Sequence, residues 1–274
     1  MHILLTATLL AGVPLGPSGA TMARAEELPE SAVSSPPMEM DDPGTPGSQG
    51  VEVNLVGTFL RAGQGRGSET LLDANYGIGD RIQLKFERPY LTQSFGRKQF
   101  QHGFGATEFG VKWRFTDHAG LQIATYPQYG CNDAFVTKDE EGNAEDKEGR
   151  SFYVPLLLSK SMGRANTLAA NVGYRRNLEN RGDDIDLALG AGRAFGHDAR
   201  VLIEVFSERD ERLRNRQTDI RAGYVGTLLP TLWTKFELGG FVSLGHSIGS
   251  TEEGEPRTSF TFGVSFVKRP RGES

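Results

Sequence analysis

The sequence is poor in cysteine, in long apolar runs and in basic charge. Its single cysteine, Cys131, excludes an internal disulfide, and the preceding Tyr129-Gly130 does not resemble a lipid-attachment signal. No stretch approaches the roughly 18 apolar residues that a membrane-spanning helix needs. Lys and Arg number 30 against 35 Asp and Glu, a formal charge of −5. Because no basic excess is available to release phosphate counterions, no nucleic-acid partner is expected.

The sequence also lacks the patterns of common catalytic and metal sites. Gly245-His246-Ser247-Ile248-Gly249 has the spacing of a Gly-x-Ser-x-Gly elbow but leads into a predicted polar loop rather than a helix, and Gly63-x-Gly65-x-Gly67 lacks the following helix and Lys-Ser/Thr of a phosphate loop. None of the histidines pairs at metal-ligand spacing within a strand: His2, His102, His118, His197 and His246. We therefore expect no catalytic residue, metal or cofactor. A Ser/His lipase site assembled across strands stays open as an alternative.

Two segments precede the part of the chain that is expected to fold. Ile3 to Val13 form a short apolar core, and Ala23-Arg24-Ala25 offers a small-x-small cleavage site, with Ser18-Gly19-Ala20 as a second candidate. Residues 1–25 are therefore predicted to be a signal peptide. Residues 26–50 are rich in Pro, Gly, Ser and acids, which predicts a disordered, flexible leader. One folded domain is expected over 51–268, followed by a tail over 269–274.

The stretch from Tyr76 to Tyr90, YGIGDRIQLKFERPY, joins a tight turn to a strand with one apolar and one charged face. Ile82, Leu84 and Phe86 alternate there with polar side chains, and a period of two predicts a β-strand. The charged face could meet bulk water, as in a soluble sandwich, or water inside a barrel whose apolar face meets lipid. The alternation recurs in about twelve strands, at 51–59, 72–76, 82–90, 109–115, 121–123, 152–159, 168–174, 185–189, 201–205, 220–224, 236–244 and 260–266.

The connections between these strands alternate in expected length. Short turns are expected at Gly77–Asp80, Thr116–Gly120, Met162–Arg164, Gly196–Ala199 and Leu228–Thr231. Longer polar loops are expected at Ala62–Glu69, Thr92–Gly103, Gly130–Arg150, Arg176–Asp183, Ser207–Arg216 and His246–Pro256. An up-and-down barrel in an outer membrane has short periplasmic turns and long extracellular loops, and an even strand count leaves both termini in the periplasm. A soluble sandwich has no reason to sort its loops by end.

Aromatic residues are expected to form a ring at each rim of such a barrel. Tyr and Trp have an apolar body and a polar tip, which suits the level of the lipid headgroups. The predicted girdle beside the short turns consists of Tyr76, Trp113, Phe115, Tyr224 and Phe266. The predicted girdle beside the long loops consists of Phe59, Tyr90, Tyr129, Phe152 and Tyr174.

The other face of the strands places both signs of charge in one narrow interior. The charged side chains predicted to line the lumen are Glu52, Lys85, Glu87, Glu108, Lys112, Arg114, Arg175, Asp186, Glu204, Arg221, Lys235 and Glu237. Glycines such as Gly110, Gly173 and Gly190 lie at inward-facing positions of the same strands. Charges inside a barrel are tolerable when they are paired or wetted. This predicts either a polar passage for small solutes or a plugged lumen in which salt bridges hold the barrel.

Two stretches suggest a family. YGIGDRIQLKFERPY, followed by GFGATEFGVKWRF from Gly103 to Phe115, resembles the outer-membrane transporter barrels grouped as the meta-pathway phenol-degradation family. The resemblance covers roughly residues 70–125 and implies a barrel that takes up small, often aromatic compounds. It brings no catalytic residues. Many outer-membrane barrels end on an aromatic residue that the insertion machinery reads, whereas here Phe266 is followed by Val267 and the tail KRPRGES.

These observations predict an all-β, up-and-down antiparallel transmembrane barrel in a Gram-negative outer membrane. The expected function is passive passage of small molecules, which include aromatic or hydrophobic compounds. The expected partners are outer-membrane lipid, lipopolysaccharide, small-molecule solutes and the barrel-assembly machinery. The acidic stretch 139–149 is interpreted as a solvated loop, with divalent cations shared with lipopolysaccharide as its alternative. A structural or adhesive barrel, a lipase-like hydrolase and a soluble β protein are the alternative functions.

Overall fold

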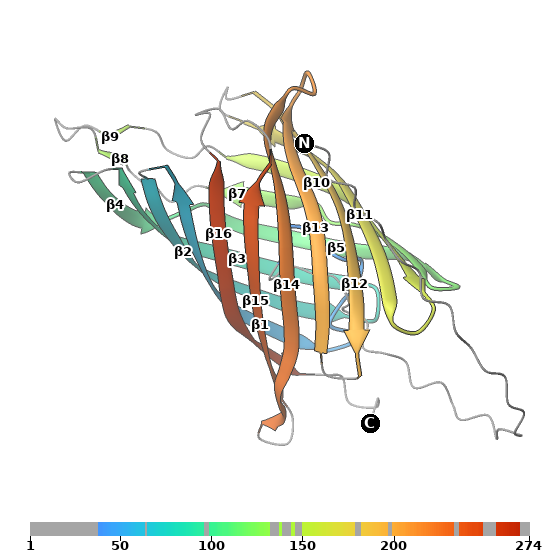
Figure 1. Ribbon diagram of the computed structural model, residues 1–274. Helices are drawn as coiled ribbons and strands as arrows, with labels where there is room; N and C mark the ends of the chain where they lie inside the picture. The colour runs from blue at the N-terminus through green and yellow to red at the C-terminus, as the bar shows by residue number, and fades with distance from the viewer. Residues whose placement is uncertain are drawn as a thin grey trace, which may run out of the picture.

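The computed structural model describes residues 38–63, 65–95, 99–131, 137–138, 144–145, 150–178, 182–196, 199–232, 236–248 and 256–268. All the regular elements found among them are strands (Figure 1). Their bounds are β1 Val51–Ala62, β2 Gly65–Ile78, β3 Ile82–Phe95, β4 Gln99–Phe104, β5 Thr107–His118, β6 Leu121–Thr125, β7 Gln128–Cys131, β8 Thr137–Lys138, β9 Ala144–Glu145, β10 Ser151–Met162, β11 Asn166–Asn177, β12 Asp184–Phe195, β13 Ala199–Asp210, β14 Asn215–Leu232, β15 Phe236–Ser247 and β16 Arg257–Lys268. No helix in the described part of the chain is long and apolar enough to cross a membrane.

One antiparallel sheet closes on itself. Strand β1 pairs with both β2 and β16, and closure follows from the pairing of β3 with β5. Strands β4 and β5 share the neighbour β3 and act as one interrupted strand, as do β6 and β7 between β5 and β10. The result is a closed barrel of 12 strands, which confirms the predicted fold (Figure 1). The short strands β8 and β9 form a separate hairpin.

The barrel has an apolar exterior and a polar interior, the reverse of a water-soluble protein. On β5, Phe109 and Trp113 are 51% and 53% exposed, whereas Lys112 and Arg114 between and beside them are 3% and 5% exposed. This apolar-out, polar-in alternation is typical of the strands of membrane barrels. The period of two in the sequence therefore sets both faces of the wall.

The connections β2–β3, β5–β6 and β10–β11 lie at one end of the barrel, here called the turn end; the opposite end is the loop end. Val51, at the start of β1, pairs with Lys268 at the end of β16, and with Tyr76 beside the β2–β3 turn. Both ends of the barrel wall therefore lie at the turn end. Gly79 and Gly163 take positive φ angles of 59° and 71° in these turns, a conformation that favours glycine.

Several predicted loops and one predicted turn are wrong, because the strands extend further than the apolar alternation does. Ala62–Glu69 is mostly the start of β2, and Thr92–Gly103 is largely paired in β3 and β4. Leu228–Thr231, predicted as a tight turn, belongs to β14, which continues to Leu232 through register shifts against β15. Polar residues can continue a ladder beyond the apolar stretch because the backbone groups still need hydrogen-bond partners.

The predicted loop Ser207–Arg216 contracts to a tight hairpin. Strand β13 continues to Asp210 and β14 begins at Asn215. One oxygen of the Asp210 carboxylate accepts the backbone N–H groups of Arg212 at 3.0 Å and Arg214 at 2.8 Å. The Asp210 side chain thus provides the hydrogen bonds of a tight turn, although the polar composition of this stretch predicts a longer loop. The acidic stretch 139–149 lies outside the described residues except for 144–145.

Folded structure begins before Val51, which corrects the prediction of a flexible leader for part of 26–50. Met38–Gly50, here called the lumen segment, lies inside the barrel, and Met38, Met40 and Asp42 are each at most 5% exposed. The composition of this stretch cannot build a core of its own. It is ordered because the barrel wall provides the partners. The predicted signal peptide, 1–25, and the tail, 269–274, lie outside the described residues.

Candidate functional site in the barrel lumen

The charged side chains predicted to face the lumen lie on the polar side of the wall, with Lys235 outside the described residues. Lys112, Arg114, Asp186, Glu204 and Arg221 are each less than a tenth exposed. The half-buried members of the set are Glu52, Lys85, Glu87, Glu108, Arg175 and Glu237. These residues surround a single polar interior rather than a catalytic cluster.

The wall brings several of these charges together in pairs. Lys85 Nζ lies 2.7 Å from Glu87, and Arg175 lies 3.7 Å from Glu108 and 3.9 Å from Asp186. Pairing of this kind offsets the cost of removing charges from water. The pairs explain how a narrow interior holds both signs of charge.

A second set of polar side chains forms a hydrogen-bonded ladder over β1, β2 and β3. Asn54 donates to Glu52 at 2.9 Å and to Asp73 at 2.8 Å. Asn75 donates to the other oxygen of Asp73 at 2.9 Å, and Gln83 donates to Asn75 at 2.5 Å. The sequence indicates the inward parity of these residues, because they alternate with apolar side chains, but it does not indicate that they form one hydrogen-bonded ladder.

The Tyr126 side chain is fully buried between two lysines. Lys85 Nζ lies 5.2 Å and Lys112 Nζ 4.8 Å from the centre of its ring, distances typical of cation–π contacts. Tyr126 falls between β6 and β7, where the strand is interrupted before Pro127. The interruption turns this ring inward and narrows the lumen.

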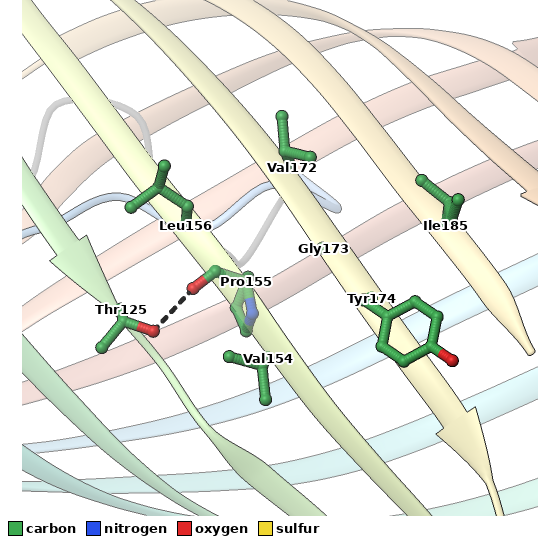
Figure 2. A pocket seen from close by; sticks show the side chains of 8 residues that line it. All are labelled: Thr125, Val154, Pro155, Leu156, Val172, Gly173, Tyr174 and Ile185. Atoms are coloured by element: carbon green, nitrogen blue, oxygen red, sulfur yellow. Dashed lines mark hydrogen bonds between the residues drawn. The ribbon is translucent and has the colours of Figure 1, made fainter.

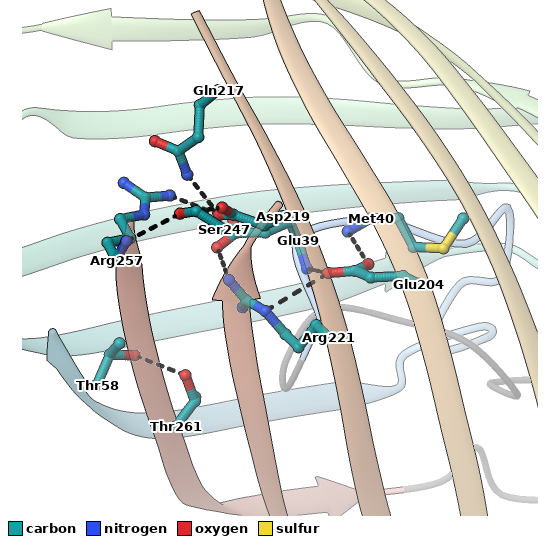
Figure 3. Close-up of polar contacts among 10 residues, drawn as sticks. All are labelled: Glu39, Met40, Thr58, Glu204, Gln217, Asp219, Arg221, Ser247, Arg257 and Thr261. Atoms are coloured by element: carbon teal, nitrogen blue, oxygen red, sulfur yellow. Dashed lines mark hydrogen bonds and ion pairs between the residues drawn. The ribbon is translucent and has the colours of Figure 1, made fainter. Parts of the chain in front are cut away.

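The lumen segment is held in the middle of the barrel by Glu204. The two oxygens of this carboxylate accept the backbone N–H groups of Glu39 at 2.8 Å and Met40 at 3.1 Å (Figure 3). Arg221, which faces Glu204 across β13 and β14, donates to the Glu39 carboxylate at 2.6 Å. A wall carboxylate and a wall guanidinium therefore hold the backbone and the side chain of the same residue.

Further contacts hold the carbonyl oxygens of residues 41 and 42. Lys112 on β5 donates to the carbonyl oxygen of Asp42 at 2.8 Å, and Asn171 on β11 donates to that of Asp41 at 3.0 Å. Going round the wall from β5 through β6, β10, β11, β12 and β13 to β14 takes six steps of the 12. Lys112 and Arg221 thus lie on opposite walls, and the segment crosses the lumen between them.

Apolar contacts complete the seat of the segment. Met38 and Met40 pack with Ala169, Ala188 and Leu202, and Phe206 and Val225 lie against this cluster. A Cβ atom at Gly190 would collide with the Met40 sulfur. Gly190 therefore leaves the space that Met40 fills, which gives a specific role to one of the glycines with inward parity.

The segment enters β1 at the turn end. Gln49 N–H donates to the carbonyl oxygen of Gly77 and Gly77 N–H donates to that of Gly50, both at 3.0 Å. Thr45 also donates to the carbonyl oxygen of Asp80 at 3.0 Å. These bonds fix the end of the segment next to β1, while residues 38–42 depend on the wall contacts in the lumen.

Two carboxylates of the segment have shifted pKa values of opposite sign. The Arg221 guanidinium holds the pKa of Glu39 below its usual value. Burial raises the pKa of Asp42 to about 6, although Lys112 opposes the shift. Asp42 Oδ2 has no hydrogen-bond partner among the described residues, while Oδ1 accepts Gly44 N–H at 2.8 Å. Burial of the charged Asp42 therefore costs free energy in the docked state.

We predict that Asp42→Asn tightens docking of the segment near neutral pH. The pKa of Asp42 is raised in the docked state, so protonation of this side chain stabilises docking. This stabilisation is fully present below pH 3.8, the ordinary pKa of the side chain, and is lost as the pH rises through about 6. Asparagine keeps the acceptor for Gly44 and removes the charge. Labelling of a reporter cysteine, Met40→Cys in a Cys131→Ser background, by a water-soluble maleimide should slow by about tenfold.

Asp41→Asn is the matched control for that prediction. Asp41 Oδ1 lies 3.7 Å from Lys112 Nζ, so its neutralisation weakens an ion pair and should speed the same labelling reaction. Equal labelling rates in the two variants would contradict the assignment of the buried charge to Asp42.

The outer face of the wall carries a shallow apolar depression of about 370 Å³ beside the interruption between β6 and β7 (Figure 2). At its base, Pro155 has no N–H to donate, and its carbonyl oxygen accepts Thr125 Oγ1 at 2.9 Å and Tyr126 N–H at 3.3 Å. Proline removes a ladder hydrogen bond from this seam. The depression is lined by Thr125, Val154, Pro155, Leu156, Val172, Gly173, Tyr174 and Ile185.

The aromatic residues predicted to form girdles lie mostly on the exposed outer face. Exposed rings there belong to Phe59, Tyr76, Trp113, Phe115, Tyr129, Phe152, Tyr174, Tyr224 and Phe266. Tyr90 is half-buried, because its hydroxyl contacts His102 Nδ1 at 2.8 Å and its ring packs edge-on against Phe104. Trp113 and Phe115 are neighbours at the turn end, with ring centres 5.6 Å apart.

Comparison with known proteins bears on the fold. No protein-family model matches the sequence, and no curated protein matches it. Among solved structures, the COG4313 outer membrane channel from Pseudomonas putida F1 is similar with a TM-score of 0.63 and 11% identity over 84% of this chain and 99% of that chain. The NanC porin gives a TM-score of 0.55 and 9% identity, over 78% of this chain and 98% of that one.

The translocator domain of the autotransporter NalP from Neisseria meningitidis gives a TM-score of 0.52 and 12% identity, over 80% of this chain and 89% of that one. At these identities the likeness concerns the fold alone. The chain therefore has the fold of the outer-membrane β-barrels.

Proposed function

We propose that the protein is an outer-membrane channel through which small molecules pass when the lumen segment moves aside. The observation that carries this proposal is the polar interior, which runs through the barrel and is crossed by a segment held by side-chain contacts. Residues 38–42, all of which the structure describes, form no strand pairing with the wall. A segment held in this way can leave without breaking the ladder of the barrel.

Several observations support a channel over the alternatives. Similar solved structures include proteins described as an outer membrane channel and a porin. Ser247 donates a hydrogen bond to Asp219 at 2.8 Å (Figure 3). The adjacent His246 contacts Thr258 instead of Ser247. This arrangement is a structural network rather than a Ser/His pair.

The cargo we propose is small and partly apolar. The resemblance to the meta-pathway phenol-degradation family suggests aromatic compounds, and the apolar depression beside Pro155 gives such compounds a place to rest on the outer wall. In this proposal the turn end faces the periplasm, residues 1–25 act as an export signal, and lipid, lipopolysaccharide and the barrel-assembly machinery are partners. A permanently plugged structural barrel is the second candidate, because the segment spans the lumen.

We predict measurable flux through the unmodified protein. Full-length protein refolded into liposomes should pass potassium ions and arabinose faster than empty liposomes do, because the segment is released intermittently. Swelling and conductance assays measure this flux, and heat-modifiable migration on gels reports folding. A folded barrel that passes neither solute above the background rate would favour the plugged structural barrel and overturn the channel.

A further inference from the structure

The seat of Met38–Met40 combines a cation with an apolar pocket, which is the chemistry that recognises an amphipathic carboxylate. The cation is Arg221, and the carboxylate that it now binds belongs to Glu39, at 2.6 Å. Arg257 adds positive charge nearby and is itself paired with Asp219 at 2.8 Å. The pair Glu39–Arg221 is thus a carboxylate on a guanidinium inside the lumen, a strong and geometrically specific interaction.

The apolar half of the seat lies beside this cation. Met40 is 1% exposed and fills the space that Gly190 leaves open against Ala188 and Leu202. An unbranched thioether side chain can be replaced by another flexible apolar chain with little loss of packing. The space that Met40 fills is therefore apolar and of the kind that a short alkyl chain can also occupy.

The carboxylate position is accessible from the water in the lumen. The Glu39 side chain is 43% exposed, although its partner Arg221 is only 7% exposed. A dissolved carboxylate can therefore reach the guanidinium from the side that Glu39 now covers. When Glu39 is displaced, Glu204 keeps Arg221 as a partner, at 3.6 Å.

We propose that this seat is a binding site for small amphipathic carboxylates, which compete with the chain's own Met38–Met40. The ligand places its carboxylate on Arg221 and its apolar tail in the space of Met40, so that binding releases the lumen segment. This inference rests on the proposed channel function, and it adds both a substrate class and the signal that opens the passage. Uncharged amphiphiles of the same size lack the group that replaces Glu39.

The test uses the full-length chain in liposomes with the Met40→Cys reporter in the Cys131→Ser background, and sodium octanoate as the probe. Saturating octanoate should raise the maleimide labelling rate by about fivefold or more, because it shifts the segment towards the released state. Octanol partitions into the bilayer without a carboxylate and should change the rate by less than about twofold. Equal effects of octanoate and octanol would overturn the proposal.

Two variants separate the site from a general effect on the barrel. Glu39→Gln weakens the internal competitor, so the half-maximal octanoate concentration should fall by about tenfold. Arg221→Gln should abolish the response to octanoate, whereas Arg193→Gln, on the exposed outer face, should keep it. A full response in Arg221→Gln, or an unchanged octanoate requirement in Glu39→Gln, would contradict the proposal.

The flux assay and the labelling assay can fail independently. Flux of arabinose without any response to octanoate, in either the reporter protein or its Glu39→Gln form, would leave the channel intact and overturn the carboxylate site. A response to octanoate in a barrel that passes no solute would leave the site intact and overturn the channel.

Discussion

A chain that starts at Thr45 should conduct ions about tenfold better than the full-length protein, because a wider lumen offers less resistance to ions. The truncation removes the contacts with Glu204, Arg221 and Lys112, which cross the lumen from one wall to the other. It keeps the Thr45–Asp80 bond and the backbone bonds of Gly77 that lead into β1. Planar-bilayer recordings of the two refolded proteins measure the difference.

The matched control for the truncation is a chain that starts at Met38, which keeps every described contact of the lumen segment. Its conductance should equal that of the full-length protein. The wall should fold in both proteins, because its polar groups are largely paired with one another: Lys85 with Glu87 and Asn54 with Asp73 are examples. A folded Thr45 chain with unchanged conductance would show that the segment is not the barrier.

A disulfide between the segment and the wall should close the channel. A Cβ atom at Gly190 would lie against the Met40 side chain, so Met40→Cys and Gly190→Cys can place two sulfur atoms within bonding reach, in a Cys131→Ser background. Oxidised protein should show at least about tenfold less flux than the same protein after reduction, because the cross-link removes the released state.

The reduced double variant is the control for its own oxidised form, and each single cysteine variant should be insensitive to the oxidant. Gel mobility under non-reducing conditions reports the fraction that is cross-linked. Undiminished flux through fully cross-linked protein would mean that solutes pass the segment without its release.

The wall could be predicted from the sequence because apolar and polar residues alternate along each strand. This alternation indicates which side chains face outward and which face inward. In β5, Phe109, Val111 and Trp113 alternate with Lys112 and Arg114, and the same rule of parity places Glu204 and Arg221 inside. The prediction of a closed barrel rested on the alternation of short and long connections between these strands. The ends of the strands could not be predicted, since polar residues near Asp210 and Thr92 continue the ladder without an apolar signal.

The lumen segment could not be predicted because its order depends on distant partners. Met38, Glu39 and Met40 precede a stretch rich in proline and glycine, which alone has too few apolar side chains to fold. The hydrogen-bond and ion-pair partners of residues 38–42 come from β5, β11, β13 and β14, and only closure of the barrel brings these strands together. The pairing of Asp219 with Arg257 and Ser247 was missed for the same reason, since it joins three strands.

The position of the lumen segment also determines the order in which the molecule can assemble. Glu39 and Met40 contact Glu204 across sequence separations of 165 and 164 residues, and Glu39 contacts Arg221 across 182. Contacts of such long range form late, because the intervening chain must be ordered first. The Thr58–Thr261 contact, which joins β1 to β16 where the wall closes, spans 203 residues, so the lumen segment and the closing seam of the wall both find their partners late.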